Sequence, residues 1–220
     1  MRSAFLFDLD GTLVDNVYQH VLAWHEALRT IGLEVSIWRL HRRIGMSGGL
    51  LARALLRETG RPMTPEAQQR LQDLHHEAYA RMVGSVLPLP GTRALLNTLD
   101  GQGVPWAIAT SGSEASARKT LSRLGVGPDA VLITRDQVRN AKPDPDLFLA
   151  AASRLGADEA IVVGDSVWDI LAARRARMLP VGVLSGGYGR EELERAGAYR
   201  VYEDPADLLA HLDELGVRLS

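Results

Sequence analysis

Two aspartates separated by one residue, Asp8 and Asp10, directly follow the apolar run Ala4–Phe7 and precede Gly11. We expect the run to form a buried strand, and Gly11 to allow a sharp turn after it. Ligands of open α/β sheets bind just beyond the carboxyl ends of the strands, so both carboxylates can face one crevice. Such neighbouring anions are costly unless a cation lies between them. The spacing therefore predicts a cation site; it does not match the glycine and glutamate positions of a calcium loop.

Hydroxyl groups and a basic residue follow the next two predicted strands. Thr110, Ser111 and Gly112 come after the strand Val104–Ala109, where hydroxyls and the N–H groups of a helix start can hold an anion. Lys142, one of only two lysines in the chain, lies among turn-forming residues just before a predicted helix. Each signal is weak alone, because Ser and Thr cap most helices and a loop lysine is ordinarily solvated.

Two more acids, Asp165 and Asp169, follow the predicted strand Ala160–Val163. Asp165 alone would be interpreted as a helix N-cap. Taken together, however, four strand ends supply acids, a hydroxyl and a lysine to one edge of a sheet. Hard carboxylate oxygens without a histidine or thiolate favour Mg²⁺. The metal would screen the aspartates from a phosphate group, whose oxygens Lys142 and the N–H groups would hold.

The elements that must position these residues alternate between short apolar runs and longer amphipathic ones, a pattern typical of a parallel sheet with crossover helices. Strands are predicted at Ala4–Phe7, Val104–Ala109, Val131–Thr134, Ala160–Val163, Pro180–Leu184 and Tyr199–Tyr202. Helices are predicted at Thr92–Leu99, Glu114–Leu124, Pro145–Leu155, Trp168–Arg177, Arg190–Ala196 and Pro205–Leu215.

Residues 16–85 interrupt this alternation, because they show only helical periodicity. The predicted helices are Val17–Thr30, Ile37–Arg43, Leu50–Thr59 and Pro65–Met82. We interpret the segment as an inserted helical bundle, with hinges at Asp15–Asn16 and at 86–91. It contains nine arginines and six acidic residues, while the rest of the chain is net acidic. This asymmetry fits an anionic ligand and chance surface charge about equally.

The composition of the 220 residues excludes several classes of protein. The absence of cysteine rules out disulfide-stapled folds, thiolate metal sites and a cysteine nucleophile. A net charge of −2 gives no electrostatic footprint for nucleic-acid binding, and no P-loop motif is present. No run has the length of a membrane span or the features of a secretory signal. We expect a cytoplasmic protein with neither nucleic acid nor membrane as partner.

The four motifs together resemble those of the haloacid dehalogenase (HAD) superfamily of hydrolases with an inserted helical cap, in its phosphoglycolate phosphatase and β-phosphoglucomutase branch. They are Asp8-x-Asp10-Gly11-Thr12, Thr110, Lys142-Pro143 and Gly164-Asp165-x3-Asp169. They occur in the family's order and span practically the whole chain. The resemblance implies an α/β fold: a Rossmann-like parallel-sheet core at residues 1–15 and 86–220, with a helical cap at 16–85.

The resemblance also implies a role for each residue. Asp8 would be the nucleophile that forms an aspartyl-phosphate. Asp10 would protonate the leaving oxygen, later activate water, and ligate the metal through its backbone carbonyl. Thr110 would hydrogen-bond the transferring phosphoryl group, and Lys142 would bridge that group and Asp8.

The expected Mg²⁺ site comprises Asp8, Asp10, Asp165 and Asp169, the last either directly or through water. Gly11, Ser111 and Gly112 are the expected phosphate-binding residues of the core. In the cap, His20, Arg43 and Ser47 are the candidate substrate-binding residues.

Two features select among the branches of the superfamily. Its dehalogenases do without an acid at the position of Asp10, because a halide leaves without a proton, so Asp10 favours phosphoryl transfer. Its phosphonoacetaldehyde hydrolases form a Schiff base with a cap lysine, and residues 16–85 contain no lysine.

A mutase stays open as an alternative. In β-phosphoglucomutase-like proteins a histidine at the spacing of His20 supports the acid/base aspartate, and basic cap residues such as Arg42 and Arg43 would grip a second phosphate. His20 also fits a first cap helix that faces the hinge, as in many capped phosphatases, and we favour that interpretation.

The loop 44–49, which includes Ser47, resembles phosphatase caps and is our candidate for substrate selection; a plain helix–helix turn is its other interpretation.

We therefore expect a Mg²⁺-dependent phosphatase for a small phosphorylated metabolite, such as phosphoglycolate or a sugar phosphate. The alternatives are a hexose-phosphate mutase and a non-catalytic phosphate-binding regulatory protein. The intact acidic set argues against the latter, because a pure binder gains nothing from crowded carboxylates. The sequence is compatible with a monomer or a homodimer.

His75 and His76 lack metal-binding spacing, and we expect them on a solvated helix face.

Overall fold

The computed structural model describes residues 3–60 and 64–217 and divides the chain into two compact units. One unit comprises the residues up to Asp15 together with those from Leu87 onward, and the other is Asn16–Val86. Within the described residues, every strand belongs to the first unit and the second is helical.

The first unit is built on a six-stranded sheet in which all paired strands are parallel. The strand order is β5-β4-β1-β6-β7-β8, which places β1 between β4 and β6. The strands are β1 (Ser3–Phe7), β4 (Trp106–Thr110), β5 (Leu132–Thr134), β6 (Glu159–Gly164), β7 (Leu179–Val183) and β8 (Arg200–Tyr202). Ala4 to Phe7 of β1 are buried, as a strand covered on both faces must be. The predicted parallel sheet is thereby confirmed.

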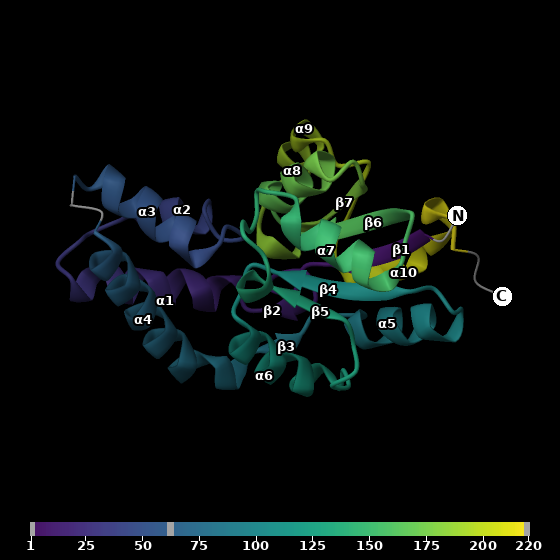
Figure 1. Ribbon diagram of the computed structural model, residues 1–220, viewed down its shortest axis with the longest axis horizontal. Coiled ribbons are helices and arrows are strands. Elements are labelled where there is room, and N and C mark those ends of the chain that lie inside the picture. Colours follow the sequence, from purple (N-terminus) through teal and green to yellow (C-terminus); the bar gives the residue numbers. More distant parts are fainter. Residues whose placement is uncertain (1–2, 61–63, 218–220) are drawn as a thin grey trace. The chain divides into compact units, whose positions relative to one another are not determined.

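Helices cover the sheet. Helix α7 (Asp146–Leu155) crosses its middle and contacts β1, β4, β5 and β6 (Figure 1). Phe148 of α7 packs in one apolar cluster with Leu6 of β1. Phe5 and Phe7 point to the opposite face, as alternate strand residues do, and their rings stack at 5.9 Å. The other helices of this unit are α5 (Thr92–Gly101), α6 (Glu114–Leu124), α8 (Val167–Arg175), α9 (Arg190–Ala196) and α10 (Pro205–Ala210).

One predicted helix is shorter than expected. The segment predicted as a single helix, Pro205–Leu215, divides into α10 and a 3₁₀ turn at Leu212–Leu215. The break is at His211, whose backbone leaves the helical region at φ −123° and whose Nδ1 lies 2.9 Å from the Asp207 carbonyl oxygen. Helical periodicity alone does not distinguish a continuous helix from two consecutive turns on one face.

The second unit consists of α1 (Val17–Thr30), α2 (Ile37–His41), α3 (Gly48–Glu58), α4 (Pro65–Met82) and the 3₁₀ turn Val83–Ser85. Helix α4 begins where the sequence predicts, because Thr64 caps the Ala67 N–H at 3.1 Å and Pro65 fits the first helical position. Helices α1 and α4 make the main packing of the unit, and Trp24 and Leu55 lie in its apolar core.

A short antiparallel ribbon stands where the sequence predicts hinges. Strand β2 (Val14–Asp15) pairs with β3 (Leu87–Pro88), and the Thr92 hydroxyl donates to the Leu13 carbonyl at 2.9 Å. The two crossings of the chain out of the sheet unit are thus hydrogen-bonded to each other. Two-residue strands are too short to show an alternating pattern, so this ribbon was not predicted.

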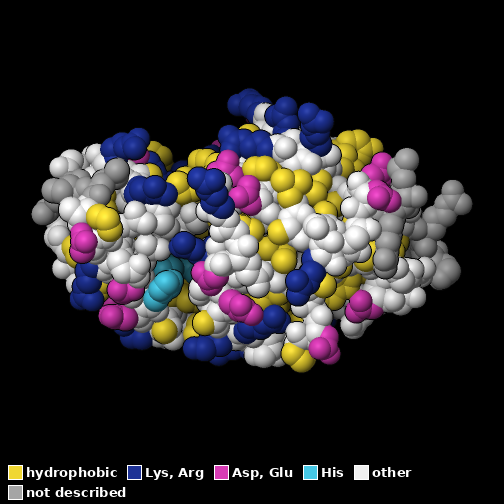
Figure 2. All heavy atoms as spheres, viewed as in Figure 1, with side chains coloured by type: hydrophobic (Ala, Val, Ile, Leu, Met, Phe, Trp, Pro, Cys, Tyr) yellow, Lys and Arg dark blue, Asp and Glu magenta, His cyan; other side chains and the backbone are white. Residues whose placement is uncertain are grey.

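Charged side chains of both signs are scattered over the face of the molecule shown in Figure 2. This agrees with the formal net charge of −2 for the whole sequence. Within residues 3–60 and 64–217, the helices are too short or too polar to cross a membrane.

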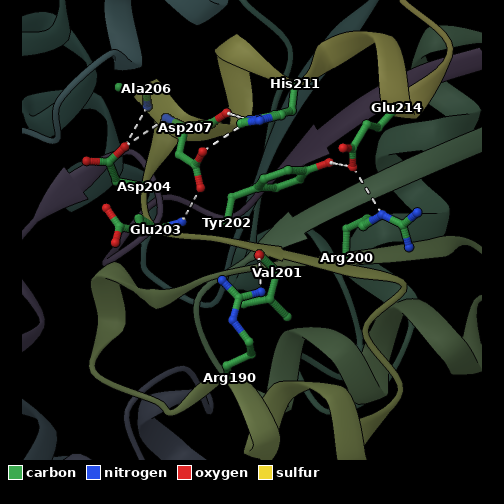
Figure 3. A network of polar contacts seen from close by, with 10 residues as sticks. All are labelled: Arg190, Arg200, Val201, Tyr202, Glu203, Asp204, Ala206, Asp207, His211 and Glu214. Atoms are coloured by element: carbon green, nitrogen blue, oxygen red, sulfur yellow. Dashed lines mark hydrogen bonds and ion pairs between the residues drawn. The ribbon is translucent and has the colours of Figure 1, made fainter.

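The edge strand β8 is fastened to α10 and the last 3₁₀ turn by a polar network (Figure 3). The Tyr202 hydroxyl donates to Glu214 Oε2 at 3.2 Å, and the same oxygen accepts from Arg200 Nε at 3.0 Å. Asp204 caps α10 by accepting from two backbone N–H groups. Burial, with the Glu214 carboxylate nearby, raises the pKa of Tyr202 to about 12, so the phenol is neutral when it donates.

Replacing Tyr202 with Phe removes only this hydroxyl, and we expect the free energy of unfolding to fall by about 1 kcal/mol. Tyr199→Phe is the matched control, because its ring is half exposed and its contact with the Arg200 guanidinium does not need the hydroxyl. Urea unfolding of both variants measures the difference. Equal stability of Tyr202→Phe and the wild type would show that the hydrogen bond adds nothing.

Candidate active site

A buried ammonium group joins two carboxylates at the carboxyl edge of the sheet. Lys142 Nζ contacts Asp8 Oδ1 and lies 2.8 Å from Asp169 Oδ1. Asp8 follows β1 directly, and its N–H donates to the Val163 carbonyl of β6 at 2.9 Å, so the sheet itself fixes its position. The Lys142 side chain is fully buried, with Nζ 5.1 Å from the centre of the Phe148 ring. The solvated loop lysine considered from the sequence is therefore excluded.

Asp165 completes a group of three carboxylates. One oxygen each from Asp8, Asp165 and Asp169 lie within 4.8 Å of one another, and all three residues are buried. Asp165 Oδ1 accepts a hydrogen bond from the Thr12 hydroxyl at 2.9 Å. The helix-capping interpretation of Asp165 is wrong, because the N-cap of α8 is Ser166.

Asp169 also stabilises the first turn of α8. Its Oδ2 accepts from the Ser166 N–H at 3.1 Å and from the Ser166 hydroxyl, closing a capping box at the start of α8. Its Oδ1 is thereby turned toward Lys142. Gly164 allows this arrangement, because a Cβ there would overlap the Asp169 side chain, with Oδ2 at 2.8 Å.

Burial of several acids around one lysine dominates the electrostatics. Burial raises the pKa of Asp8 to about 7, an effect that Lys142 opposes and that Asp169 and Asp10 increase. Burial likewise raises the pKa of Asp165, with Asp169 and Asp8 adding to it. Burial alone would lower the pKa of Lys142, but Asp169 and Asp8 outweigh it and the pKa is raised. The cluster therefore carries more negative charge than its lysine compensates.

This donor set fits a divalent cation such as Mg²⁺. The three grouped residues offer only hard carboxylate oxygens: Asp8 follows β1, Asp165 follows β6, and Asp169 lies in the first turn of α8. Burial, and after it the neighbouring carboxylates, raise the pKa values of Asp8 and Asp165, and a bound cation would favour the ionised form of both groups. Asp10 is not in this side-chain group, and its contribution through the backbone carbonyl stays a prediction.

The remaining predicted residues of the core lie around this cluster. Gly11 has φ +82°, which permits the predicted turn after β1. The Thr110 hydroxyl at the end of β4 accepts from the Gly112 N–H at 3.0 Å. A Cβ on Gly112 would lie 3.8 Å from Asp10 Oδ2. Asp10 and the Thr110–Gly112 loop, with Ser111 between, are thus neighbours.

The candidate residues of the helical unit are engaged within that unit. The Arg43 guanidinium pairs with Glu58 and donates to the Arg39 carbonyl at 2.8 Å. Ser47 caps α3 by accepting from the Leu50 N–H at 3.4 Å, which gives it a structural role.

His20 belongs to an aromatic stack between α1 and α4. Its ring lies 3.9 Å from the Tyr79 ring, and its Nδ1 lies 3.3 Å from His75 Nε2. His75 also stacks on Trp24 at 4.2 Å and is buried, so the solvated position expected for it is wrong. His76 is exposed, as expected. Two aromatic residues, Trp24 four residues after His20 and Tyr79 four residues after His75, could have indicated this buried stack.

This stack makes the stability of the helical unit sensitive to pH. Burial, with His20 and His76 nearby, lowers the pKa of His75 well below its ordinary value. In the unfolded chain His75 takes up a proton near pH 6.5, whereas in the folded chain it stays neutral to a lower pH. The free energy of unfolding therefore has its full value above pH 6.5 and decreases as the pH falls below it. We expect a loss of up to about 1.4 kcal/mol per pH unit below pH 6.5.

Urea unfolding between pH 5 and pH 7.5 measures this slope. In His75→Phe, which keeps an aromatic ring, we expect a flatter slope than in the wild type, whereas exposed His76→Gln should keep the wild-type slope. Identical slopes for the wild type and His75→Phe would contradict the assignment.

Comparison with known proteins agrees with this geometry. Residues 3–177 match the family model described as haloacid dehalogenase-like hydrolase, and residues 140–215 match a second HAD-hydrolase-like model. A phosphoglycolate phosphatase of Rhodospirillum rubrum is 34% identical over 218 residues, covering 94% of this chain and 90% of that protein. Hexitol phosphatase A of Escherichia coli is 36% identical, covering 83% and 77%.

A solved structure extends the likeness to three dimensions. The crystal structure of a hydrolase from Pseudomonas syringae has a TM-score of 0.94 and 53% identity, covering 97% of this chain and 99% of the other. The family models, the phosphatase relatives and the buried acidic cluster at the strand ends agree with one another. This chain belongs to the haloacid dehalogenase-like hydrolases, as a phosphoric monoester hydrolase.

Proposed function

We propose that this protein is a Mg²⁺-dependent phosphatase that hydrolyses a small phosphomonoester through an aspartyl-phosphate. The observation that carries the proposal is the contact of Lys142 with Asp8 inside a group of three buried carboxylates. A carboxylate held between an ammonium group and a cation site can approach a phosphate dianion without strong repulsion. Such an arrangement serves a nucleophile, whereas a binding protein would gain more from neutral or basic groups.

The first step is attack by an Asp8 oxygen on phosphorus, in line with the departing alkoxide. The ester P–O bond breaks as the Asp8 O–P bond forms, and Asp10 gives its proton to the leaving oxygen. Lys142 and the Thr110 hydroxyl would hold the oxygens of the transferring group. Bound Mg²⁺, held by Asp8, Asp165, Asp169 and the Asp10 carbonyl, would supply charge screening for the phosphate.

The second step returns the enzyme to its starting state. Asp10, now ionised, removes a proton from water, and the water oxygen attacks phosphorus. The Asp8 O–P bond breaks and inorganic phosphate leaves. Asp10 is again protonated, so protons and atoms balance over the two steps.

The proposed substrates are phosphoglycolate and small sugar or sugar-alcohol phosphates. Relatives that share about one third of the residues are named phosphoglycolate phosphatase and hexitol phosphatase. A hexose-phosphate mutase would need a second phosphate site; of the two residues considered for it, Arg42 and Arg43, Arg43 pairs with Glu58. The relatives named as phosphatases favour hydrolysis. His20 and the loop that contains Ser47 are proposed to shape substrate selection.

The activity itself is tested by phosphate release from a panel of small phosphomonoesters, with Mg²⁺ and with excess EDTA. We expect Mg²⁺-dependent release from a few members of the panel, and loss of it with EDTA. Bisphosphate-dependent conversion of a hexose 1-phosphate to a 6-phosphate without phosphate release would instead identify a mutase.

Replacing Asp8 with Asn should lower turnover at least about 1,000-fold, because an amide oxygen is a poor nucleophile and the shape is kept. Asp129→Asn is the control, since Asp129 is exposed on a loop of the same unit. The measurement is phosphate release with the best substrate of the panel. A near-normal rate for Asp8→Asn would rule out the aspartyl-phosphate.

Substrates with different leaving groups distinguish the role of Asp10 as a proton donor from the effect of its charge on the site. An alkyl alcohol needs a proton to leave and p-nitrophenol does not, so Asp10→Asn should lose about 100- to 10,000-fold on an alkyl phosphate in the first step. We expect a smaller loss in the burst of p-nitrophenol from p-nitrophenyl phosphate, followed by slow turnover. Equal losses of the first step on both substrates would refute the acid role.

A further inference from the structure

The turn that follows β7 approaches the acidic cluster, although no motif marks it in the sequence. It is a 3₁₀ turn, Leu184–Gly186, at the carboxyl end of β7, which neighbours β6 in the sheet. The Leu184 N–H donates to the Glu203 carbonyl at 3.1 Å, and the Gly187 N–H donates to the Leu184 carbonyl at 2.9 Å. The turn is therefore closed by its own hydrogen bond and is joined at its start to the residue after β8.

Gly186 abuts the Asp165 side chain. A Cβ built on Gly186 would overlap the carboxylate at Oδ2 and would lie 2.5 Å from Cγ and 2.6 Å from Cβ of Asp165. These three atoms are the nearest neighbours of that position, and real Cβ atoms do not approach so closely. The backbone of Gly186 is not in the left-handed region, so its conformation does not require glycine. The requirement for glycine comes from Asp165.

Asp165 is consequently held on two sides. Thr12 donates to Oδ1 at 2.9 Å, and the backbone of Gly186 borders the Oδ2 side. The preceding residue, Ser185, donates its hydroxyl to the Gly11 carbonyl at 2.6 Å. One turn thus touches both the loop after β1 and the carboxylate after β6.

We propose that Ser185 and Gly186 are positioning residues of the metal site: they fix the Asp165 carboxylate and the Gly11 peptide, and so set the affinity for Mg²⁺. This inference rests on the proposed function insofar as the cluster binds Mg²⁺. Oxygen ligands of Mg²⁺ must be placed with near-octahedral geometry, so a small displacement of one carboxylate weakens binding. Groups that orient metal ligands typically contribute 10- to 100-fold to affinity.

Gly186→Ala tests the close approach, because alanine suits the backbone and the nearest atoms that its Cβ would meet belong to the Asp165 side chain. Gly189→Ala is a matched control three residues along: its φ is −74°, it is exposed, and its Cβ would lie no nearer than 3.4 Å to Glu192. Ser185→Ala tests the hydrogen bond to Gly11 without adding atoms.

Mg²⁺ binding is measured by isothermal titration calorimetry, and the melting temperature is measured with and without Mg²⁺. We expect the Kd of Gly186→Ala to rise at least about tenfold, that of Ser185→Ala to rise less, and that of Gly189→Ala to match the wild type. The increase in melting temperature on adding Mg²⁺ should shrink in the same order. A merely structural glycine would lower the melting temperature equally with and without Mg²⁺.

Wild-type affinity in Gly186→Ala overturns the inference while leaving the proposed function intact. Absence of Mg²⁺ binding by the wild type overturns the proposed cofactor, and the inference with it. If Gly186→Ala does not fold, Ser185→Ala decides: weakened Mg²⁺ binding supports the positioning role, and unchanged binding overturns it.

Discussion

The arrangement of the sheet unit depends on keeping one buried ammonium group among several carboxylates. Lys142 is fully buried and contacts both Asp8 and Asp169, while Asp165 and Asp10 add further negative charge. A buried charge is tolerated only when it is paired and hydrogen-bonded. The lysine therefore stabilises the acids in part, and the acids retain the lysine in its charged form. The excess of negative charge would favour the binding of a cation at this site.

The topology explains how these groups meet. Strand β1 lies between β4 and β6, so the residues after three adjacent parallel strands emerge at one edge. The register places Phe7 opposite Ile108 and Val163, which brings Asp8 close to the ends of both neighbours. The last member, Lys142, comes from the loop before α7, which packs across the same strands. Residues distant in sequence converge because the parallel crossovers return each strand to the same direction.

The sequence predicted the parts of the site that depend on position along a strand. Asp8, Thr110 and Asp165 follow apolar runs, and a parallel sheet must bring such ends together. The tertiary contacts were not predictable in the same way: nothing in the local sequence shows that Lys142 contacts Asp169 as well as Asp8. Helix ends marked by capping residues, such as those of α6, were placed correctly.

Predictions failed where burial is decided by distant packing. His75 was expected on a solvated helix face, yet it packs on Trp24 and Tyr79. Gly186 gives no signal, because its importance lies in the space that Asp165 occupies. Close approach between two loops is a property of three-dimensional placement, and a single sequence does not contain it as a pattern.

The total charge of the site relates the proposed Mg²⁺ to the proposed proton on Asp10. Four ionised carboxylates and one ammonium leave three uncompensated negative charges in and around the buried cluster. A bound Mg²⁺ would offset two of them, and one more must be neutralised before a phosphate dianion can approach without repulsion. The proton on Asp10 that the departing alkoxide requires would remove that last charge. In the proposed mechanism, the same protonation state would serve both substrate binding and departure of the alcohol, so the two requirements of the first step would be met together.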